Sequence, residues 1–196
     1  MITPHPRARA TGMVPNGAKV REAILHIIHE TDARDRRVTQ FDILKTLFLA
    51  DRSHLNKYGR PITFDEYVAM KDGPVPSLAY DVLKGALGGL REAEIEKPLW
   101  VARPAGARSF HFMKAARQAS EDILSESDIE ELNEALTLVL KLGYNGTWKK
   151  VHADPAYIKV WGARGERNQV PIDPELLLDR PHEHAGRDLK FLSAHS

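Results

Sequence analysis

Cysteine is absent from the 196-residue sequence, which excludes disulfides, thiolate catalysis and thiolate metal ligation within it. No apolar run approaches the roughly 18 residues that a membrane-spanning helix needs. An excess of one charge is also missing, since 28 Lys and Arg face 27 Asp and Glu. No overall field therefore favours nucleic acid or a membrane surface. With 42% hydrophobic and 28% charged residues, the sequence predicts a soluble globular protein, and we expect it to be cytoplasmic.

Motifs typical of catalytic sites are equally scarce. The sequence contains no GxSxG, no GxxxxGK[ST], no GxGxxG and no HExxH. Glu94-Ile-Glu96-Lys97 resembles the acid-x-Lys element of some metal-dependent nucleases, but such sites also need an earlier Asp positioned by a sheet. Asp72, which precedes a Gly-Pro turn, suits that role poorly, so a solvated charge run is the simpler interpretation. We therefore predict that the protein is not an enzyme.

A metal site would need three or four ligands, and the best candidate set is incomplete. Asp51 and His54 share one helix face, and His152 could add a third ligand only if the later helices fold back. Nine His in 196 residues make such pairs probable by chance. We predict no metal and no cofactor.

The length favours one domain with tails. Residues 1–18 carry several Pro and Gly and no acid, which is typical of a flexible N-terminal tail. Residues 19–162 form the predicted domain, and residues 163–196 a C-terminal tail or docking extension.

Hydrophobic spacing predicts a mainly α fold (α+β) with a small antiparallel sheet or hairpin. The first helix is expected from about Lys19 to Thr31, and the second after a Thr39–Asp42 cap. Later elements are predicted as a short strand that ends at Gly73-Pro74, a helix capped by Ser77, a hairpin turning at Gly106, a helix capped by Ser127 and Glu130 that ends at Gly143, and short helices starting at Thr147 and at Asp154-Pro155.

Asp51 lies three residues after Phe48 and four before Leu55, so its carboxylate falls on the stripe that faces the core. A buried carboxylate needs donors, and the candidates are the amides of the following turn, Arg60 and Tyr67. His54 and Tyr58 follow at helical spacing, so the three side chains could form one hydrogen-bonded row. A structural anchor is the favoured interpretation, with partner contact and catalysis as alternatives. Arg52, one position round the helix, is expected to point outward.

The stretch Gly73-Pro74-Val75-Pro76-Ser77 has two interpretations. Gly and Pro fix a sharp turn that leaves Ser77 free to cap a helix. Rigid, exposed Pro residues beside Tyr67 and Tyr80 would also suit a docking surface, because little entropy is lost on binding.

Several blocks of the sequence resemble a known family. LADRSHLNKYGRPIT, DEYVAM, GPVPS and YDVLK are similar to the Panacea domain, the antitoxin domain of SocA-like and phage-associated GepA-like proteins. Trp148, His152, Pro155 and Trp161 resemble the family's C-terminal helical part, so the likeness spans about Lys19 to Trp161. Phe64 departs from the pattern, which usually has Gly at this place. The motif residues are Asp51, His54, Tyr58, Gly59, Pro61, Gly73 and Pro74.

The resemblance implies a non-enzymatic antitoxin that neutralises a toxin encoded beside it by direct binding. The family pairs one domain with many unrelated toxins, so the toxin's fold is left open. SocA-like members also act as adaptors that hand the toxin to a Clp-type protease. The resemblance therefore implies such a protease as a second candidate partner. The candidate partner-binding residues are Arg52, Arg60, Tyr67, Pro76 and Tyr80.

A transcriptional regulator is the alternative function. Two helices followed by a hairpin could form a winged DNA-binding domain with Arg103 and Arg108 on the wing. DNA is thus a less favoured partner than a toxin.

Overall fold

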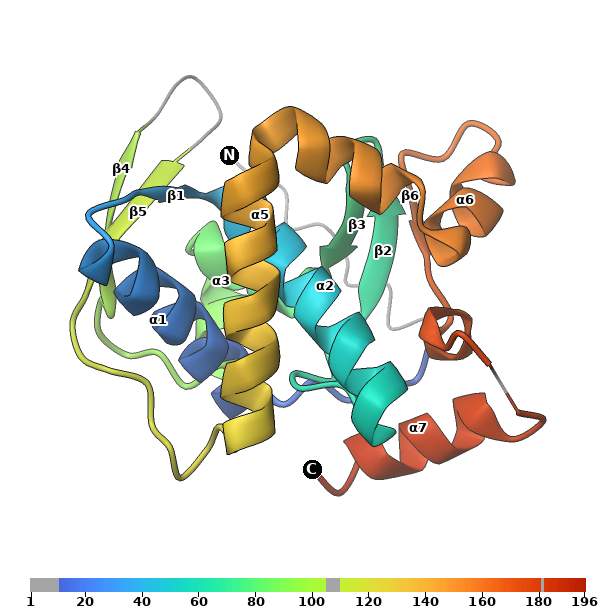
Figure 1. The fold of residues 1–196 in the computed structure, drawn as a ribbon. Helices are drawn as coiled ribbons and strands as arrows, with labels where there is room; N and C mark the ends of the chain where they lie inside the picture. The colour runs from blue at the N-terminus through green and yellow to red at the C-terminus, as the bar shows by residue number, and fades with distance from the viewer. Residues whose placement is uncertain (1–10, 105–109, 181) are drawn as a thin grey trace.

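The computed structural model describes residues 11–104, 110–180 and 182–196 (Figure 1). Within these residues it contains seven α-helices and two three-stranded antiparallel sheets, which confirms the mainly α fold with small antiparallel sheets. None of the helices in this part of the chain is both long and apolar enough to cross a bilayer.

The first two helices begin at side-chain caps. α1 (Gly17–Ala33) starts where Asn16 accepts from the Lys19 amide at 2.9 Å, and α2 (Gln40–Tyr58) starts at the predicted Thr39–Asp42 capping box. α2 ends at Gly59, whose φ of 78° lies in the left-handed region that glycine adopts easily. Local sequence therefore fixes the ends of the helix that carries the family motif.

α2 lies at the centre of the molecule, with a hydrophobic cluster on either side. Leu44 and Leu47 face the larger cluster with α1, whereas Phe48 and Leu55 face the smaller one with Tyr67. α2 makes its most extensive helix contact with α5 (Glu126–His152), which crosses in front of it in Figure 1. Because both of its sides are buried, α2 is the rigid element around which the other elements are arranged.

α5 begins two residues earlier than predicted and bends in the middle. Its capping box is Ser125 with Asp128, rather than Ser127 with Glu130. Gly143 (φ 60°, ψ −174°) breaks the helical backbone at the predicted cap position, but a second helical segment follows directly and runs to His152. In Figure 1 this bend carries the second segment past the start of α2 toward α6 (Pro155–Gly162). α6 starts with Asp154 as cap and Pro155 in its first turn, as predicted.

The first sheet has the order β3-β2-β6 and joins distant parts of the chain. Its strands are β2 (Tyr67–Met70), β3 (Gly73–Pro76) and β6 (Gln169–Pro171). The short strand predicted around Tyr67 and Ala69 is β2, but Gly73-Pro74 was wrongly expected to stop the sheet, because Pro74 belongs to β3 and pairs with Ala69. β3 is an edge strand of this sheet, where a missing N–H is tolerated.

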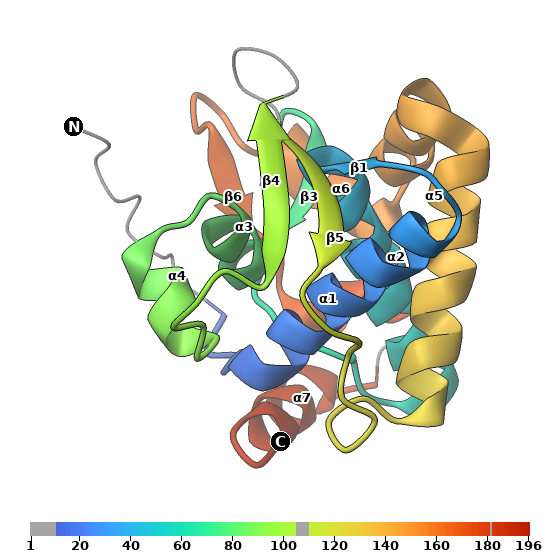
Figure 2. The ribbon, with the colours of Figure 1, turned by 90° about the vertical axis from the view of Figure 1, so that its left-hand side faces the viewer.

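The second sheet has the order β1-β5-β4 and covers α1 (Figure 2). Its strands are β1 (Val38–Thr39), β5 (Phe110–Ala115) and β4 (Trp100–Pro104), so the predicted β4–β5 hairpin is present. Trp100 and Phe112 pack edge to face with ring centroids 6.5 Å apart. Gly106 and Arg108 lie outside the described residues, and Arg103 is exposed.

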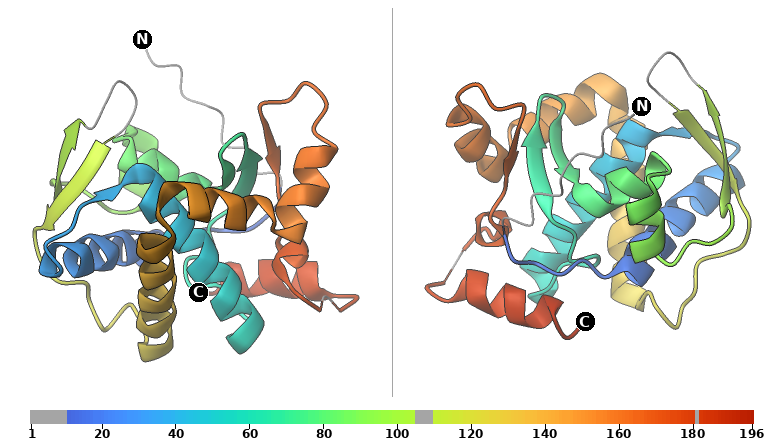
Figure 3. Two further views of the ribbon diagram at one scale, coloured as in Figure 1. Left: turned by 45° about the horizontal axis from the view of Figure 1, so that its top comes forward. Right: turned by 180° about the vertical axis from the view of Figure 1, so that it is seen from behind.

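The remaining elements complete the packing. α3 (Ser77–Leu83) and α4 (Leu87–Glu92) follow β3, and η1 (Pro174–Leu177) and α7 (Ala185–Ser193) follow β6. Views from above and behind place α7 across the base of the molecule, beside η1 (Figure 3).

The expected terminal tails differ from what the structure shows. Thr11 and Met13 are buried, so the flexible tail expected over residues 1–18 does not extend through residues 11–18. Ile172, Leu177 and Leu189 belong to the smaller hydrophobic cluster. The segment after residue 162 therefore packs continuously with the rest, although its standing as an extension to the family domain stays a prediction.

Glu22 on α1 fixes the loop that leads into α5. Its buried carboxylate accepts from both terminal nitrogens of Arg117, at 2.6 and 2.7 Å, from Arg21 Nε at 2.8 Å and from the Ser120 amide at 2.9 Å. Burial disfavours the charged form, but these hydrogen bonds outweigh it and lower the pKa of Glu22 to about 2.

This lowered pKa predicts an acid-sensitive contribution to stability. Because the folded pKa lies below the ordinary value of 4.5, the contribution is present above pH 4.5 and is lost as the pH falls toward about 2. We expect Glu22→Gln to lower the free energy of unfolding by about 1 to 3 kcal/mol at neutral pH and to flatten its fall in that window. Urea unfolding at several pH values measures both effects, with the exposed Glu121→Gln as control. An unchanged acid limb in the Gln variant would contradict this role.

Candidate functional site

Asp51 is buried, as its helical phase predicts, and its two oxygens divide the donors between them. Oδ1 accepts from the amides of Ile62 and Thr63 at 2.9 and 3.0 Å. Oδ2 accepts from the Tyr67 hydroxyl at 2.8 Å and from the Thr63 hydroxyl. Burial raises the pKa of Asp51, and the hydrogen bonds from Thr63, Tyr67 and Ile62 oppose that shift. Asp51 thus ties α2 to the segment that leads into β2.

The predicted row of Asp51, His54 and Tyr58 is not a single hydrogen-bonded unit. His54 is buried and bonds through Nδ1 to the Arg60 carbonyl oxygen at 2.7 Å and through Nε2 to Ser127 Oγ at 3.0 Å. Tyr58 is 49% exposed and touches His54 only by ring contact, with centroids 4.5 Å apart. Asp51 and Tyr58 are about two helical turns apart along α2, so each has its own partners.

Asp128, which sequence reasoning missed, brings together His54, Lys19 and Arg60 from three parts of the chain. Its carboxylate lies 2.7 Å from Lys19 Nζ, 3.1 Å from His54 Nε2 and 3.0 Å from Arg60. The sequence analysis named Arg60 as a candidate donor to Asp51, but Arg60 pairs with Asp128 instead. Burial alone would raise the pKa of Asp128, but His54, Lys19 and the Ser125 amide hold it well below its usual range. A signal was available in the sequence, because Ser125 and Asp128 form a second Ser-x-x-acid pattern two residues before the predicted cap.

Asp65 takes the capping role that the sequence suggested for Ser77. Its oxygens accept from the Leu78 and Ala79 amides, both at 2.9 Å, at the start of α3, whereas Ser77 is itself the first helical residue. Burial raises the pKa of Asp65 to about 7, against the effect of these two amides. A cap that lies twelve residues before its helix cannot be recognised from local spacing.

Three side chains from different helices hold the β2–β3 turn by its carbonyl oxygens. Lys45 Nζ donates to Pro74 O at 2.8 Å, the Tyr157 hydroxyl donates to Met70 O at 2.9 Å, and His152 Nε2 lies 3.0 Å from Lys71 O. Lys45 is buried, and burial lowers its pKa to about 7 while the charge of Asp72 opposes the shift. The turn is thus fixed by α2, α5 and α6 together.

This arrangement corrects the expectation of an exposed docking loop. Gly73, Pro74 and Pro76 are buried, and Tyr67 is 2% exposed, so neither Tyr67 nor Pro76 offers a surface to a partner in this conformation. Pro61 is buried as well. Tyr80 is half-buried, with Lys84 Nζ 4.7 Å from the centre of its ring. The family motif is therefore mostly an internal scaffold.

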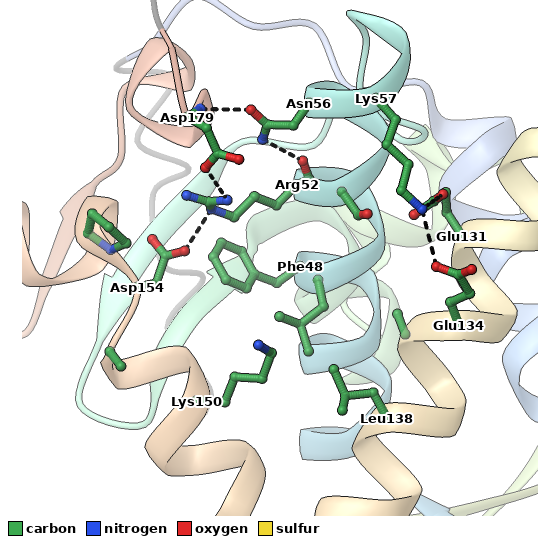
Figure 4. Close-up of a pocket in the computed structure, with 15 residues that line it drawn as sticks. Phe48, Arg52, Asn56, Lys57, Glu131, Glu134, Leu138, Lys150, Asp154 and Asp179 are labelled. Carbon is green, nitrogen blue, oxygen red and sulfur yellow. Dashed lines mark hydrogen bonds and ion pairs between the residues drawn. The ribbon is translucent and has the colours of Figure 1, made fainter.

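The scaffold supports an open groove on the outer side of α2 (Figure 4). The groove has a volume of about 810 Å³ and is bounded by α2, by both segments of α5 and by the start of α6. Phe48, Leu49, Ala135 and Leu138 give it an apolar lining, and Lys150 projects toward it from the second segment of α5. An apolar floor with charged edges is the usual form of a protein-binding groove.

Arg52 closes one end of the groove by an ion-pair bridge. Its Nε lies 2.7 Å from Asp154, and its NH1 lies 2.9 Å from Asp179. Asn56 strengthens this end, because its amide accepts from the Asp179 backbone N–H at 2.7 Å and donates to Leu177 O at 2.9 Å. Arg52 was expected to point freely outward, but its side chain is only 18% exposed and links α2 to residues more than a hundred positions later.

Toward the same end of α2, on the side that faces α5, Lys57 pairs with two acids from α5 (Figure 4). Lys57 Nζ lies 2.5 Å from Glu131 and 3.2 Å from Glu134. Glu131 is 1% exposed, and its Oε2 is buried without a hydrogen-bond partner. The Glu134 side chain is 60% exposed, so it is the acid at this place that a donor bound in the groove could reach.

The candidate metal and nuclease residues do not come together. Within the described residues no group of three or more His, Asp and Glu could hold a metal ion. His152 instead bonds to two backbone carbonyl oxygens, those of Trp148 and Lys71. The Glu94 side chain is 76% exposed and lies 3.4 Å from Arg21, in keeping with a solvated charge run.

A family model described as antitoxin SocA-like, Panacea domain, matches residues 43–157. This match covers more than half of the sequence. The chain belongs to the SocA-like Panacea domain family. Comparisons with curated proteins and with solved structures returned no match.

Phe64, named above as a departure from the Panacea pattern, has a structural explanation. Phe64 adopts φ 53°, in the left-handed region where glycine is favoured, and glycine is what the pattern usually has there. Its ring is 2% exposed and belongs to the smaller hydrophobic cluster, so burial of the ring offsets the backbone cost.

This balance predicts the result of restoring the glycine. We expect Phe64→Gly to destabilise the protein by about 1 to 3 kcal/mol, because the loss of a buried ring outweighs the relief of backbone strain. Phe64→Ala, which loses the ring but keeps the strain, should be worse by about 1 kcal/mol. Denaturant unfolding of both variants tests the order, and Ala more stable than Gly would contradict it.

Proposed function

We propose that this protein is an antitoxin that neutralises a protein toxin by binding a segment of it in the α2–α5 groove. The observation that supports this proposal is the extent of the Panacea match, residues 43–157, which includes both walls of the groove and the start of α6. The same region contains the internal scaffold that holds α2 and α5 in place. The bound segment would place apolar side chains against Leu49 and Leu138 and hydrogen-bond donors near Glu134.

In this proposal the protein acts by binding and not by catalysis. The buried carboxylates of the scaffold, Asp51 and Asp65, accept hydrogen bonds from backbone amides, which is a structural role. A groove open along its length suits a helix or an extended segment better than a small substrate. In this proposal the binding takes place in the cytoplasm.

The experiment that tests the proposal is co-expression with the protein encoded beside it. We expect that neighbour alone to arrest growth, the pair to restore growth, and the two purified proteins to elute together on size exclusion. A neighbour that is harmless alone, or that neither is rescued by this protein nor binds it, would overturn the proposal.

The adaptor role is a separate proposal drawn from the SocA-like resemblance. If it holds, a purified Clp-type protease should degrade the toxin only when this protein is present. Degradation at the same rate without it would remove the adaptor role and leave neutralisation untouched.

A further inference from the structure

A second hollow lies where the Gly143 bend, the start of α2, the β2–β3 turn and residues 161–168 meet. It has a volume of about 920 Å³ and shares no lining residue with the α2–α5 groove. Four aromatic side chains line it. They are Phe41, Tyr80, Tyr144 and Trp161, and we call this site the aromatic basin.

The aromatic rings of the basin are packed but remain partly accessible. Tyr144 is 55% exposed and packs against Phe41 with ring centroids 4.6 Å apart. Trp161 has Tyr157 stacked at 5.9 Å and the Arg164 guanidinium carbon 4.3 Å from its ring centre. Rigid Tyr, Trp and Arg side chains of this kind are enriched where proteins bind tightly.

Positive charge around the basin exceeds negative charge. Lys45, Lys71, Arg164 and Arg167 line it together with only two acids, Asp72 and Glu166. In the part of the chain that the structure describes, none of these four cations forms an ion pair.

The two arginines are oriented by backbone oxygens instead of carboxylates. Arg164 NH1 donates to Trp161 O at 3.0 Å, and Arg167 Nε donates to Arg164 O at 3.0 Å. At the floor, Lys45 Nζ is buried and has Pro74 O as its hydrogen-bond acceptor. The two arginines are thus held in place without a carboxylate partner in the described part of the chain, which favours an incoming anion.

We infer that the aromatic basin binds an acidic segment of a partner protein, one that carries carboxylates next to an aromatic or aliphatic side chain. The carboxylates would pair with Arg164 and Arg167, and the apolar side chain would lie against Tyr144 and Phe41. A nucleotide base fits less well, because Trp161 is already covered by Tyr157 and Arg164 and offers no free pair of ring faces. The inference is independent of the groove proposal, since the two sites share no residue.

The test uses short fluorescein-labelled peptides and the full-length protein in an anisotropy titration. One peptide places Asp and Glu around a single Trp, a second replaces each acid by its amide, and a third keeps the acids and lacks the Trp. The variants are Arg167→Glu and Tyr144→Ser in the basin, with Leu138→Glu in the groove. Arg187→Glu on α7 makes the same charge change at a side chain that is 74% exposed and serves as the matched control.

We expect saturable binding of the acidic Trp peptide alone, weakened about tenfold or more by Arg167→Glu and by Tyr144→Ser. Arg187→Glu and Leu138→Glu should bind it as the native protein does. No saturable binding, equal binding of the amide peptide, or equal weakening by Arg187→Glu would overturn the inference. Displacement by inorganic phosphate at peptide-like concentrations would overturn it in favour of a small-anion site. Loss of binding in Leu138→Glu alone would place the peptide in the groove and overturn it too.

Discussion

Asp51→Ala is expected to lower the free energy of unfolding by about 2 to 4 kcal/mol. The substitution leaves two buried amides, those of Ile62 and Thr63, and the hydroxyls of Thr63 and Tyr67 without their acceptor. The loss is below the sum of four broken hydrogen bonds, because the cost of burying the carboxylate is removed as well. Urea unfolding measures the change directly.

Asp51→Asn separates the acceptor role from the charge. The amide oxygen can replace Oδ1 toward the two backbone amides, and the amide nitrogen can donate to the two hydroxyls, which are free to rotate. We therefore expect this variant to lose less than about 1 kcal/mol. Asp122→Ala, at an exposed position, is the control and should unfold like the native protein. If Asp51→Ala unfolds like the native protein but loses function, Asp51 belongs to a functional site and not to the scaffold.

Gly143→Ala is the second change with a large expected effect, and it acts through the backbone alone. At φ 60° and ψ −174° a residue with a Cβ is strained, although no atom lies within 4 Å of the position that the Cβ would take. We expect a loss of about 1 to 3 kcal/mol, together with movement of the second α5 segment. That segment carries Lys150 into the groove and Tyr144 into the basin, so both sites should be altered.

Gly88→Ala provides the matched control for the bend. Gly88 lies within α4, and a Cβ there also meets nothing within 4 Å. Since Ala favours a helix over Gly, this variant should keep or gain up to about 1 kcal/mol. Thermal unfolding and circular dichroism compare the two, and equal stability of both variants would show that the bend tolerates a side chain.

The sequence predicted the features that depend on local patterns. Helical spacing gave the inward phase of Asp51, and capping chemistry gave the starts of α2 and α6. Gly143 was correctly read as a break, but a break does not show whether the next helix continues the same element or leaves it. The second segment of α5, and with it the shape of the groove, required tertiary information.

The errors came from contacts between residues distant in the sequence. Gly73-Pro74 looked like an exposed turn because Gly and Pro are typical of surfaces, yet Lys45, His152 and Tyr157 satisfy the carbonyl oxygens around it and allow its burial. Arg52 looked free because its partners, Asp154 and Asp179, lie more than a hundred residues later. Spacing rules cannot reveal such partners.

The proposed function is the binding of a toxin in the α2–α5 groove, which the scaffold holds in shape. Isothermal titration of the purified toxin against Leu138→Glu, with Leu87→Glu as control, tests it most directly. Leu138 lines the groove, whereas Leu87 is 72% exposed on α4 and does not line it. We predict a native melting temperature for both variants and an affinity about 30-fold lower or worse for Leu138→Glu alone, the effect of losing one central contact. An unchanged affinity in Leu138→Glu, or an equal loss in Leu87→Glu, would contradict the account.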